Sequence, residues 1–276
     1  MHIIHNLNNL YQHRNLIYTL VQRELKARYR GSMLGFFWTF LNPFLLMVIY
    51  SLVFSVFLRY SDPAIQPYAV YLFSGLLPWL WFSSATIEST ASLLEGGNLV
   101  KKVIFPTEIL PIVKVLSNLV NFLLSLLMLI PFNIYYLYIS KTANTLYKPF
   151  SLSLVYLPVV VLVHLAFIMG LALLLSSLNV HFRDIFQLIA NLLTFWFFLT
   201  PIIYPKETLL NGSAMMRWQY RLNPLAHITA AYQHIFFYGR TPDLAALAKV
   251  FAGSFVLILA GYWVFDRLRD SFSEVV

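Results

Sequence analysis

The chain has 276 residues, of which 59% are hydrophobic and only 11% are charged, whereas a soluble domain has roughly 25% charged residues. This composition excludes a soluble globular protein and indicates a polytopic membrane protein. The absence of cysteine excludes a disulfide framework and a thiolate metal site. We attribute the net charge of +8 to loops that set membrane orientation, not to nucleic-acid binding.

The N-terminal arm, residues 1–33, is expected to be an interface helix and not a signal peptide, because basic residues interrupt it. Residues 14–30 predict a helix with an apolar stripe along one face. Glu24 and Arg28, at i,i+4 spacing, continue that stripe on the same face. This amphipathic helix lies in the cytoplasmic interface, either as a lipid anchor alone or as an anchor that also contacts a partner. Its candidate contact residues are Arg23, Glu24, Lys26, Arg28 and Arg30.

Six apolar segments approach the length of about 20 residues that a membrane-spanning helix needs. They cover residues 35–58, 63–87, 115–140, 149–182, 185–205 and 250–265, and the last extends to residue 244 if Lys249 snorkels. An even number of spans places both termini on one side, and the distribution of lysine and arginine favours the cytoplasm. Kinks are expected at the prolines inside these spans, Pro43, Pro78, Pro131 and Pro158.

A short charged segment, residues 98–111, separates the second and third spans and is predicted to form a helix. Lys101, Lys102 and Phe105 share one face of that helix, opposite an apolar face. An aromatic side chain on a basic face suits a knob that enters a groove on another protein. The alternative is an ordinary interfacial helix with lipid-anchoring lysines.

The outer loop, residues 204–243, contains an apolar segment at 225–238 that is too short to cross the membrane. Such a segment can dip partway into the membrane and return only where protein buries it. Metal binding by His227 and His234 is not expected, because zinc would need further ligands. His164 lies inside the fourth span, where it serves either a proton relay or a hydrogen bond to a neighbouring helix.

Several stretches, taken in chain order, carry a family resemblance. Residues 20–59 contain RELKARYRGS running into WTFLNP and the first span, and later segments read NVHFRDI (179–185), FFLTPIIYP (197–205), RLNPL (221–225) and FSEVV (272–276). With residues 98–111, which look like a coupling helix, these stretches resemble the permease subunits of ABC-2 exporters for O-antigen, capsule and teichoic acid. The resemblance covers nearly the whole chain.

The resemblance implies an all-α polytopic fold in a single transmembrane domain, residues 1–276. The interface helix occupies 1–33, a six-span bundle 34–266 and a cytoplasmic tail 267–276. Within the bundle lie the coupling helix at 98–111 and re-entrant gate helices in the periplasmic region 204–243. The implied assembly is a homodimer with two ABC ATPase subunits in the bacterial inner membrane. It exports a lipid-linked polysaccharide and contacts membrane lipids but no nucleic acid.

The resemblance also implies site residues. The candidate residues for ATPase coupling are Lys101, Lys102, Phe105, Pro106, Glu108, Arg183 and Asp184. The pathway, lined mainly by the first and fifth spans, has as candidates Trp38, Phe40, Asn42, Phe195, Trp196, Phe198 and Tyr204. Aromatic faces suit the passage of sugar rings, although lipid-facing packing is the alternative for these side chains.

No G-x-x-x-x-G-K-[ST] motif occurs in the sequence, so ATP and Mg²⁺ are expected on the partner subunit and no cofactor or metal on this chain. One rival interpretation is an ABC-2 permease for teichoic acid, capsule, drugs or lipids. Another is a structural assembly subunit without transport. A third, an integral-membrane transferase, would need catalytic carboxylates, and the acidic residues are scattered singly, although Glu88 and Glu95 stand at seven-residue spacing.

Overall fold

The computed structural model describes residues 12–28, 30–57, 62–97, 106–139 and 145–272, and within them it is helical without any strand. The α-helices, in chain order, are α2 (Arg14–Arg28), α3 (Trp38–Ser51), α4 (Tyr68–Glu95), α6 (Ile109–Leu126), α7 (Leu129–Ile134), α8 (Leu157–His181), α9 (Asp184–Leu199), α10 (Lys206–Leu210), α11 (Ala214–Leu222), α12 (Pro224–Gln233) and α13 (Leu244–Leu268). Short 3₁₀ or π-helical turns join them: η1 (Gly35–Phe37), η2 (Leu52–Phe57), η3 (Pro63–Ile65), η4 (Tyr135–Ile139), η5 (Leu152–Tyr156), η6 (His234–Tyr238) and η7 (Arg269–Ser271).

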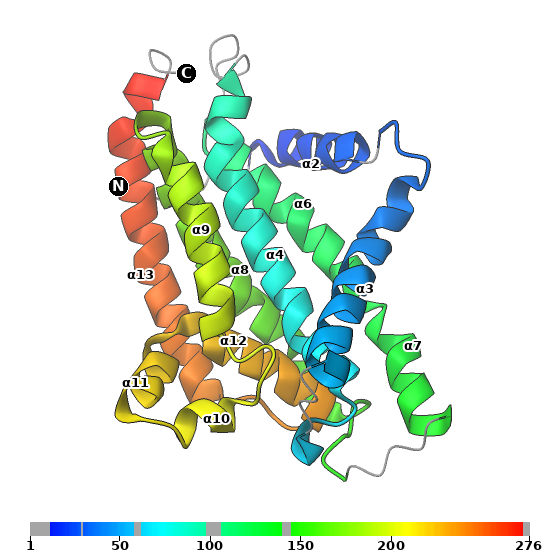
Figure 1. The fold of residues 1–276 in the computed structure, drawn as a ribbon. Helices are drawn as coiled ribbons and strands as arrows, with labels where there is room; N and C mark the ends of the chain where they lie inside the picture. The colour runs from blue at the N-terminus through cyan, green and yellow to red at the C-terminus, as the bar shows by residue number, and fades with distance from the viewer. Residues whose placement is uncertain (1–11, 29, 58–61, 98–105, 140–144, 273–276) are drawn as a thin grey trace.

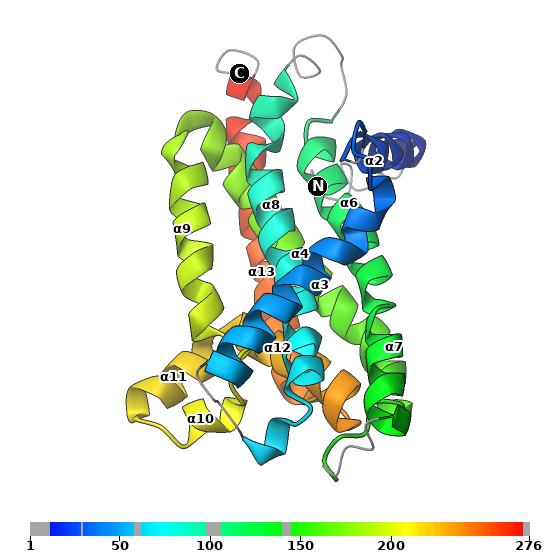
Figure 2. The same cartoon turned by 45° about the vertical axis from the view of Figure 1, so that its right-hand side comes forward.

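The long helices run side by side between two ends of the molecule (Figure 1). At one end α2 lies across the bundle, and at the other the short helices α10, α11 and α12 gather (Figures 1 and 2). The central helix is α4, which packs against α3, α6, α8, α9 and α12 and carries more of the buried apolar side chains than any other described helix. Because α4 is long and mostly buried, it contacts elements at both ends of the bundle and positions them.

Five segments are long and apolar enough to cross a membrane, namely Gly35–Phe54, Tyr68–Glu95, Ile109–Tyr138, Leu152–His181 and Leu244–Ser271. They match five of the six predicted spans, and the predicted extension of the last helix to Leu244 is confirmed. The second span continues beyond its predicted end to Glu95, and the third starts earlier, at Ile109. Residues 109–111 therefore belong to α6, so the predicted end of the coupling helix at residue 111 is wrong. Residues 98–105 of that predicted helix lie outside the described part of the chain.

The prediction for the fifth span was wrong at its end. Helix α9 stops at Leu199, six residues before the predicted boundary at Pro205, and has 16 residues. At 1.5 Å per residue it extends about 24 Å, less than the hydrocarbon core of about 30 Å. The stop has a local cause: Thr200 precedes Pro201 and adopts an extended conformation with ψ of 136°, since proline disfavours the helical conformation in the residue before it.

The predicted kink at Pro158 was also wrong, because Pro158 occupies the first turn of α8, where its missing N–H is not needed. Pro43 and Pro78 do lie inside α3 and α4. Pro131 lies in α7, just after the break that separates α6 from α7. The proline ring crowds the carbonyl four residues earlier, which explains a break at that place.

Helices α8 and α13 pack closely along their length, and two glycines make this possible. A Cβ added to Gly261 would lie 2.7 Å from the carbonyl oxygen of Gly170, and one added to Gly170 would lie 3.0 Å from the backbone nitrogen of Ile258. Real side chains do not approach backbone atoms so closely, so any larger residue separates the helices. By contrast, a Cβ added to Gly253 would meet nothing within 4 Å.

We predict that Gly261→Leu destabilises the protein by about 1–3 kcal/mol, because overpacking forces α8 and α13 apart. Thermal denaturation of the purified protein, followed by size-exclusion chromatography, measures the effect. Gly253→Ala on the same helix is the control and should leave the midpoint unchanged or raise it. Equal midpoints for Gly261→Leu and the unaltered chain would contradict the close packing of the two helices.

Candidate functional site

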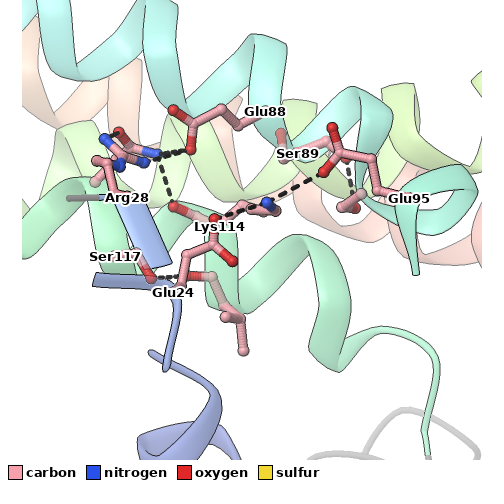
Figure 3. Close-up of polar contacts among 10 residues, drawn as sticks. Glu24, Arg28, Glu88, Ser89, Glu95, Lys114 and Ser117 are labelled. Carbon is pink, nitrogen blue, oxygen red and sulfur yellow. Dashed lines mark hydrogen bonds and ion pairs between the residues drawn. The ribbon is translucent and has the colours of Figure 1, made fainter. Parts of the chain in front are cut away.

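A charged network attaches α2 to the bundle at the end where both α4 and the last helix α13 finish (Figure 3). Arg28 of α2 forms an ion pair with Glu88 of α4, with 2.6 Å between Nη2 and Oε2. Its Nη1 also donates to Asn118 Oδ1 of α6 at 3.1 Å, and Asn118 Nδ2 donates to Glu88 Oε2 at 2.7 Å. Three helices thus meet at one closed set of hydrogen bonds.

Lys114 of α6 forms the second part of the network. Its Nζ lies 2.8 Å from Glu24 Oε1 of α2 and 3.2 Å from Glu95 Oε2 of α4 (Figure 3). The lysine side chain is only 17% exposed, so its charge needs these partners. No described residue of α2 is buried, and exposed ion pairs contribute only about 0.2–1 kcal/mol each. The attachment of α2 is therefore polar and depends on several contacts acting together.

The network separates the predicted interface residues into two groups. Glu24 and Arg28, which continue the apolar stripe, point toward the bundle and make the ion pairs. Arg23, Lys26 and Arg30 are exposed on the remaining surface. Sequence reasoning missed the partners of α2, which are Glu88, Lys114 and Asn118, and the additional ion pair of Lys114 with Glu95. Lys114 gave a usable signal, because a cation in an otherwise apolar helix must find an anion when it is buried.

The candidate coupling residues also fall into groups. Arg183 and Asp184 are exposed at the turn between α8 and α9, where Asp184 occupies the first turn of α9. Pro106 and Glu108 are buried instead, and Glu108 Oε1 lies 3.5 Å from Arg269 Nη1 in the turn after α13. Lys101, Lys102 and Phe105 lie outside the described residues. Glu108 thus joins the start of α6 to the end of the chain's last helix.

A groove of about 330 Å³ lies between α3, α4 and α9. Its wall is mostly apolar and aromatic. The ring of Phe197 contacts both Tyr50 and Trp79, with 5.5 Å between ring centroids in each pair. Hydroxyl groups of Tyr50, Ser83 and Thr194 interrupt this wall. The groove offers flat ring faces and a few neutral hydrogen-bonding groups. The contact between Trp79 and Phe197 was not predicted from the sequence, because the two residues lie on helices far apart in the chain.

A second, more polar cavity of about 390 Å³ lies beside the groove, between α3, α4 and α6. Arg28 of the charged network lines it, together with two of the candidate pathway residues, Trp38 and Asn42. The remaining polar lining is uncharged and consists of Ser32, Thr39, Ser84, Asn118, Asn121 and Ser125. Neutral amides and hydroxyls beside indole rings are groups that hydroxyl-rich ligands can contact without strong charge pairing.

The other pathway candidates take different orientations. Phe195 and Phe198 are 62% and 55% exposed on α9, and Trp38 is 40% exposed at the start of α3. Trp196 instead turns into the bundle, where its Nε1 donates to Asn223 Oδ1 at 2.9 Å. Phe40 is half-buried and packs against the rings of Phe36 and Phe37. Tyr204 lies just after α9, and its hydroxyl donates to the Phe198 carbonyl oxygen at 2.8 Å.

At the opposite end, α12 and η6 bury most of residues 224–238 against α4, α8 and α13. Lys206 Nζ lies 2.8 Å from Nε2 of His234, and burial together with the charge of Lys206 lowers the pKa of His234 to about 4. His227 contacts the carbonyl oxygen of Arg221 at 3.2 Å instead. Among the described residues no three His, Asp or Glu side chains group as metal ligands.

His164 of α8 is buried in an aromatic setting. Its ring lies 4.5 Å from that of Trp81 and 5.9 Å from that of Tyr232, between centroids. Neither ring nitrogen has a hydrogen-bond partner among the described residues. The described residues therefore provide neither the hydrogen bond to a neighbouring helix nor the start of a relay that the sequence left open.

These features define, over the described residues, a helical protein with five segments able to span a membrane. A family profile described as ABC-2 type transporter matches residues 15–237, and the chain belongs to this family. It is 40% identical over 274 residues to the O-antigen export system permease protein RfbA of Myxococcus xanthus, covering 99% of this chain and 100% of the relative. Two proteins of the same name from Klebsiella pneumoniae are 28% and 27% identical over 273 residues, covering 99% of this chain and 98% of each relative.

Membership in a transporter family, with relatives named as permeases, identifies the chain as a transporter component and rules against the transferase interpretation. The contacts agree with this, since Glu88 and Glu95, the carboxylates at seven-residue spacing, are each paired with a basic side chain. An ABC-2 system implies an ATPase partner, and the chain's apolar helices place it in a membrane.

We predict that Arg28→Glu releases α2 from the bundle, because it places two carboxylates side by side and removes hydrogen bonds worth about 1–3 kcal/mol. The double variant Arg28→Glu with Glu88→Arg should restore the attachment, since Asn118 can donate and accept in either orientation. The chain has no native cysteine, so spin labels on cysteines introduced at Ala27 and Leu123 report the distance between α2 and α6. A narrow distance distribution in the single variant would contradict the role of the network.

Proposed function

We propose that the chain is the permease half of an ATP-driven exporter that moves a lipid-linked polysaccharide of the O-antigen kind across the bacterial inner membrane. The observation that carries the proposal is the full-length 40% identity to a protein named as an O-antigen export permease. The groove and cavity support it, since they combine ring faces with neutral amides and hydroxyls. Sugar rings bind such surfaces through stacking and weak hydrogen bonds.

The proposed complex contains two copies of this chain and two ATPase subunits, with both termini of each permease in the cytoplasm. Helices α3 and α9 would line the path where the two copies meet. Their exposure supports this arrangement, because only 17% of the first span's apolar window is buried and α9 exposes Phe195 and Phe198. In this arrangement α9 serves as the sixth span despite its length, and α12 with η6 forms the outer re-entrant gate.

The proposed mechanism uses residues 98–105 and the turn at Arg183 and Asp184 as the contacts with the ATPase. The segment 98–105 connects the end of α4 to the start of α6, and these helices hold α2 through Glu88 and Lys114. A rigid-body movement delivered to this segment would therefore move α4, α6 and α2 together. Because α4 also forms the back wall of the groove, the movement would change the shape of the path.

We expect Phe195→Ala with Phe198→Ala to lower export by about tenfold, because two stacking contacts of about 0.5–1.5 kcal/mol each are lost. Surface polysaccharide is measured in cells that lack the native gene, at equal permease expression. The matched control is Phe251→Ala with Phe255→Ala, two aromatic residues on α13 with similar exposure, 49% and 54%. Equal export by the two double variants would contradict a pathway wall on α9.

Phe105→Ala with Lys101→Ala should uncouple the partner ATPase from export, so that ATP hydrolysis continues while surface polysaccharide is lost. The matched control is Phe150→Ala with Lys148→Ala, an exposed aromatic and an exposed basic residue next to η6, where the Lys148 backbone nitrogen donates to the Phe237 carbonyl oxygen. ATP hydrolysis by the purified complex and polysaccharide export are measured on the same strains. Normal export with normal co-purification of the ATPase would refute the coupling assignment for residues 98–105.

A further inference from the structure

A cavity of about 670 Å³ lies at the end of the molecule opposite α2, between α11, α12 and the first turns of α13. One end of the cavity is lined by the basic side chains of Arg221 and Lys249, beside His227. The lining also includes the apolar side chains of Phe167, Val250 and Leu257, of which Leu257 lies about 12 Å along α13 from Lys249. The cavity is therefore amphiphilic, with two cations at one end and hydrocarbon at the other.

The two cations have no carboxylate partner of their own. Neither Arg221 nor Lys249 takes part in an ion pair with another described residue. Asp243 also lines the cavity, but its Oδ1 accepts a hydrogen bond from the Ala246 backbone nitrogen at 3.0 Å and caps the start of α13. Two positive charges beside the single negative charge of Asp243 leave a net positive charge that attracts an anion.

The apolar end is kept open by a glycine that packing does not require. Gly253 lines the cavity, and a Cβ added there would meet nothing within 4 Å, unlike at Gly261 two turns later. A glycine inside a helix costs about 1 kcal/mol relative to alanine. Lys249, Gly253 and Leu257 follow each other at i, i+4 and i+8, so one stripe of α13 runs from the cation along the open groove.

The stripe also matches the depth profile of a membrane leaflet. Helix α13 belongs to the candidate span Leu244–Ser271, and Lys249 lies about 8 Å along it, within snorkelling reach of the headgroup level. Gly253 and Leu257 follow at about 14 and 20 Å, where acyl chains lie. Next to them the side chains of Phe251 and Phe255 are exposed on the helix.

We propose that this cavity binds an anionic phospholipid of the leaflet at this end of the bundle. The phosphate lies between Arg221 and Lys249, and one acyl chain follows Gly253 and Leu257. A free phosphate would leave the apolar end unused, and a neutral sugar would leave both cations unpaired. A choline headgroup would bring a third positive charge to them. The bound lipid would bridge α11 to α13, in addition to the transport role of the groove on α9.

The test uses the full-length protein in lipid nanodiscs of phosphatidylcholine, with or without phosphatidylglycerol, and native mass spectrometry to count retained lipids. We expect the unaltered protein to retain phosphatidylglycerol in preference to phosphatidylcholine. Arg221→Gln with Lys249→Gln should reduce its retention by about tenfold, because charge-assisted hydrogen bonds to the phosphate are lost. The matched control, Arg217→Gln with Arg240→Gln, removes two cations at the same end that do not line this cavity and should retain the lipid.

Gly253→Leu tests the acyl-chain half of the site while both cations remain. It should fill the groove and reduce phosphatidylglycerol retention, and it should fold, because the position is open and loses a helix glycine. Its thermal midpoint in phosphatidylcholine alone verifies folding. Undiminished retention in either cavity variant, an equal loss in the control, or equal retention of phosphatidylcholine would overturn the proposal. Competition by glycerol phosphate as strong as that by phosphatidylglycerol would also overturn it, since a headgroup alone would then suffice.

Discussion

The contacts of Lys114 with Glu24 and Glu95 join α6 to α2 and α4 in a chain that has few charged residues. In an apolar environment a buried charge must be paired, and a polar backbone group must be bonded within the protein. The first requirement places α2 against α4 and α6, because Arg28 and Glu24 find their partners there. The second requirement favours helices for the spanning segments, because a helix satisfies its own backbone hydrogen bonds.

The same constraint links the charged network at the end of α4 to the groove. Helix α4 carries Glu88 and Glu95 at one end and Trp79 and Ser83 in its middle, so it is part of both features. Burial of most of its side chains leaves α4 little freedom to bend independently, and a displacement at its end would be transmitted along its length. This is why the proposed coupling segment, which begins where α4 ends, is well placed to act on a path lined by α3 and α9.

Aromatic residues serve different purposes in different parts of the molecule. Trp81 and Phe82 pack around His164 inside the bundle, whereas Phe195 and Phe198 are exposed on α9. Trp196 lies between these exposed rings in sequence yet donates a hydrogen bond to Asn223 within the protein. One helix can therefore present a ring surface on one side and bond to Asn223, just before α12, on the other, as its 3.6-residue period allows.

The sequence by itself determined the membrane class, five of the spanning segments and the amphipathic arm, because long apolar runs and helical periodicity are local properties. It also carried the family resemblance that the comparisons confirmed. Tertiary structure alone decided which charges pair: Glu88 and Arg28 are 60 residues apart, and nothing local in either segment specifies the other. It likewise decided the orientation of Trp196 and the amphiphilic cavity beside α13. These depend on which faces of distant helices pack together, and a residue's own neighbours in the chain do not encode that choice.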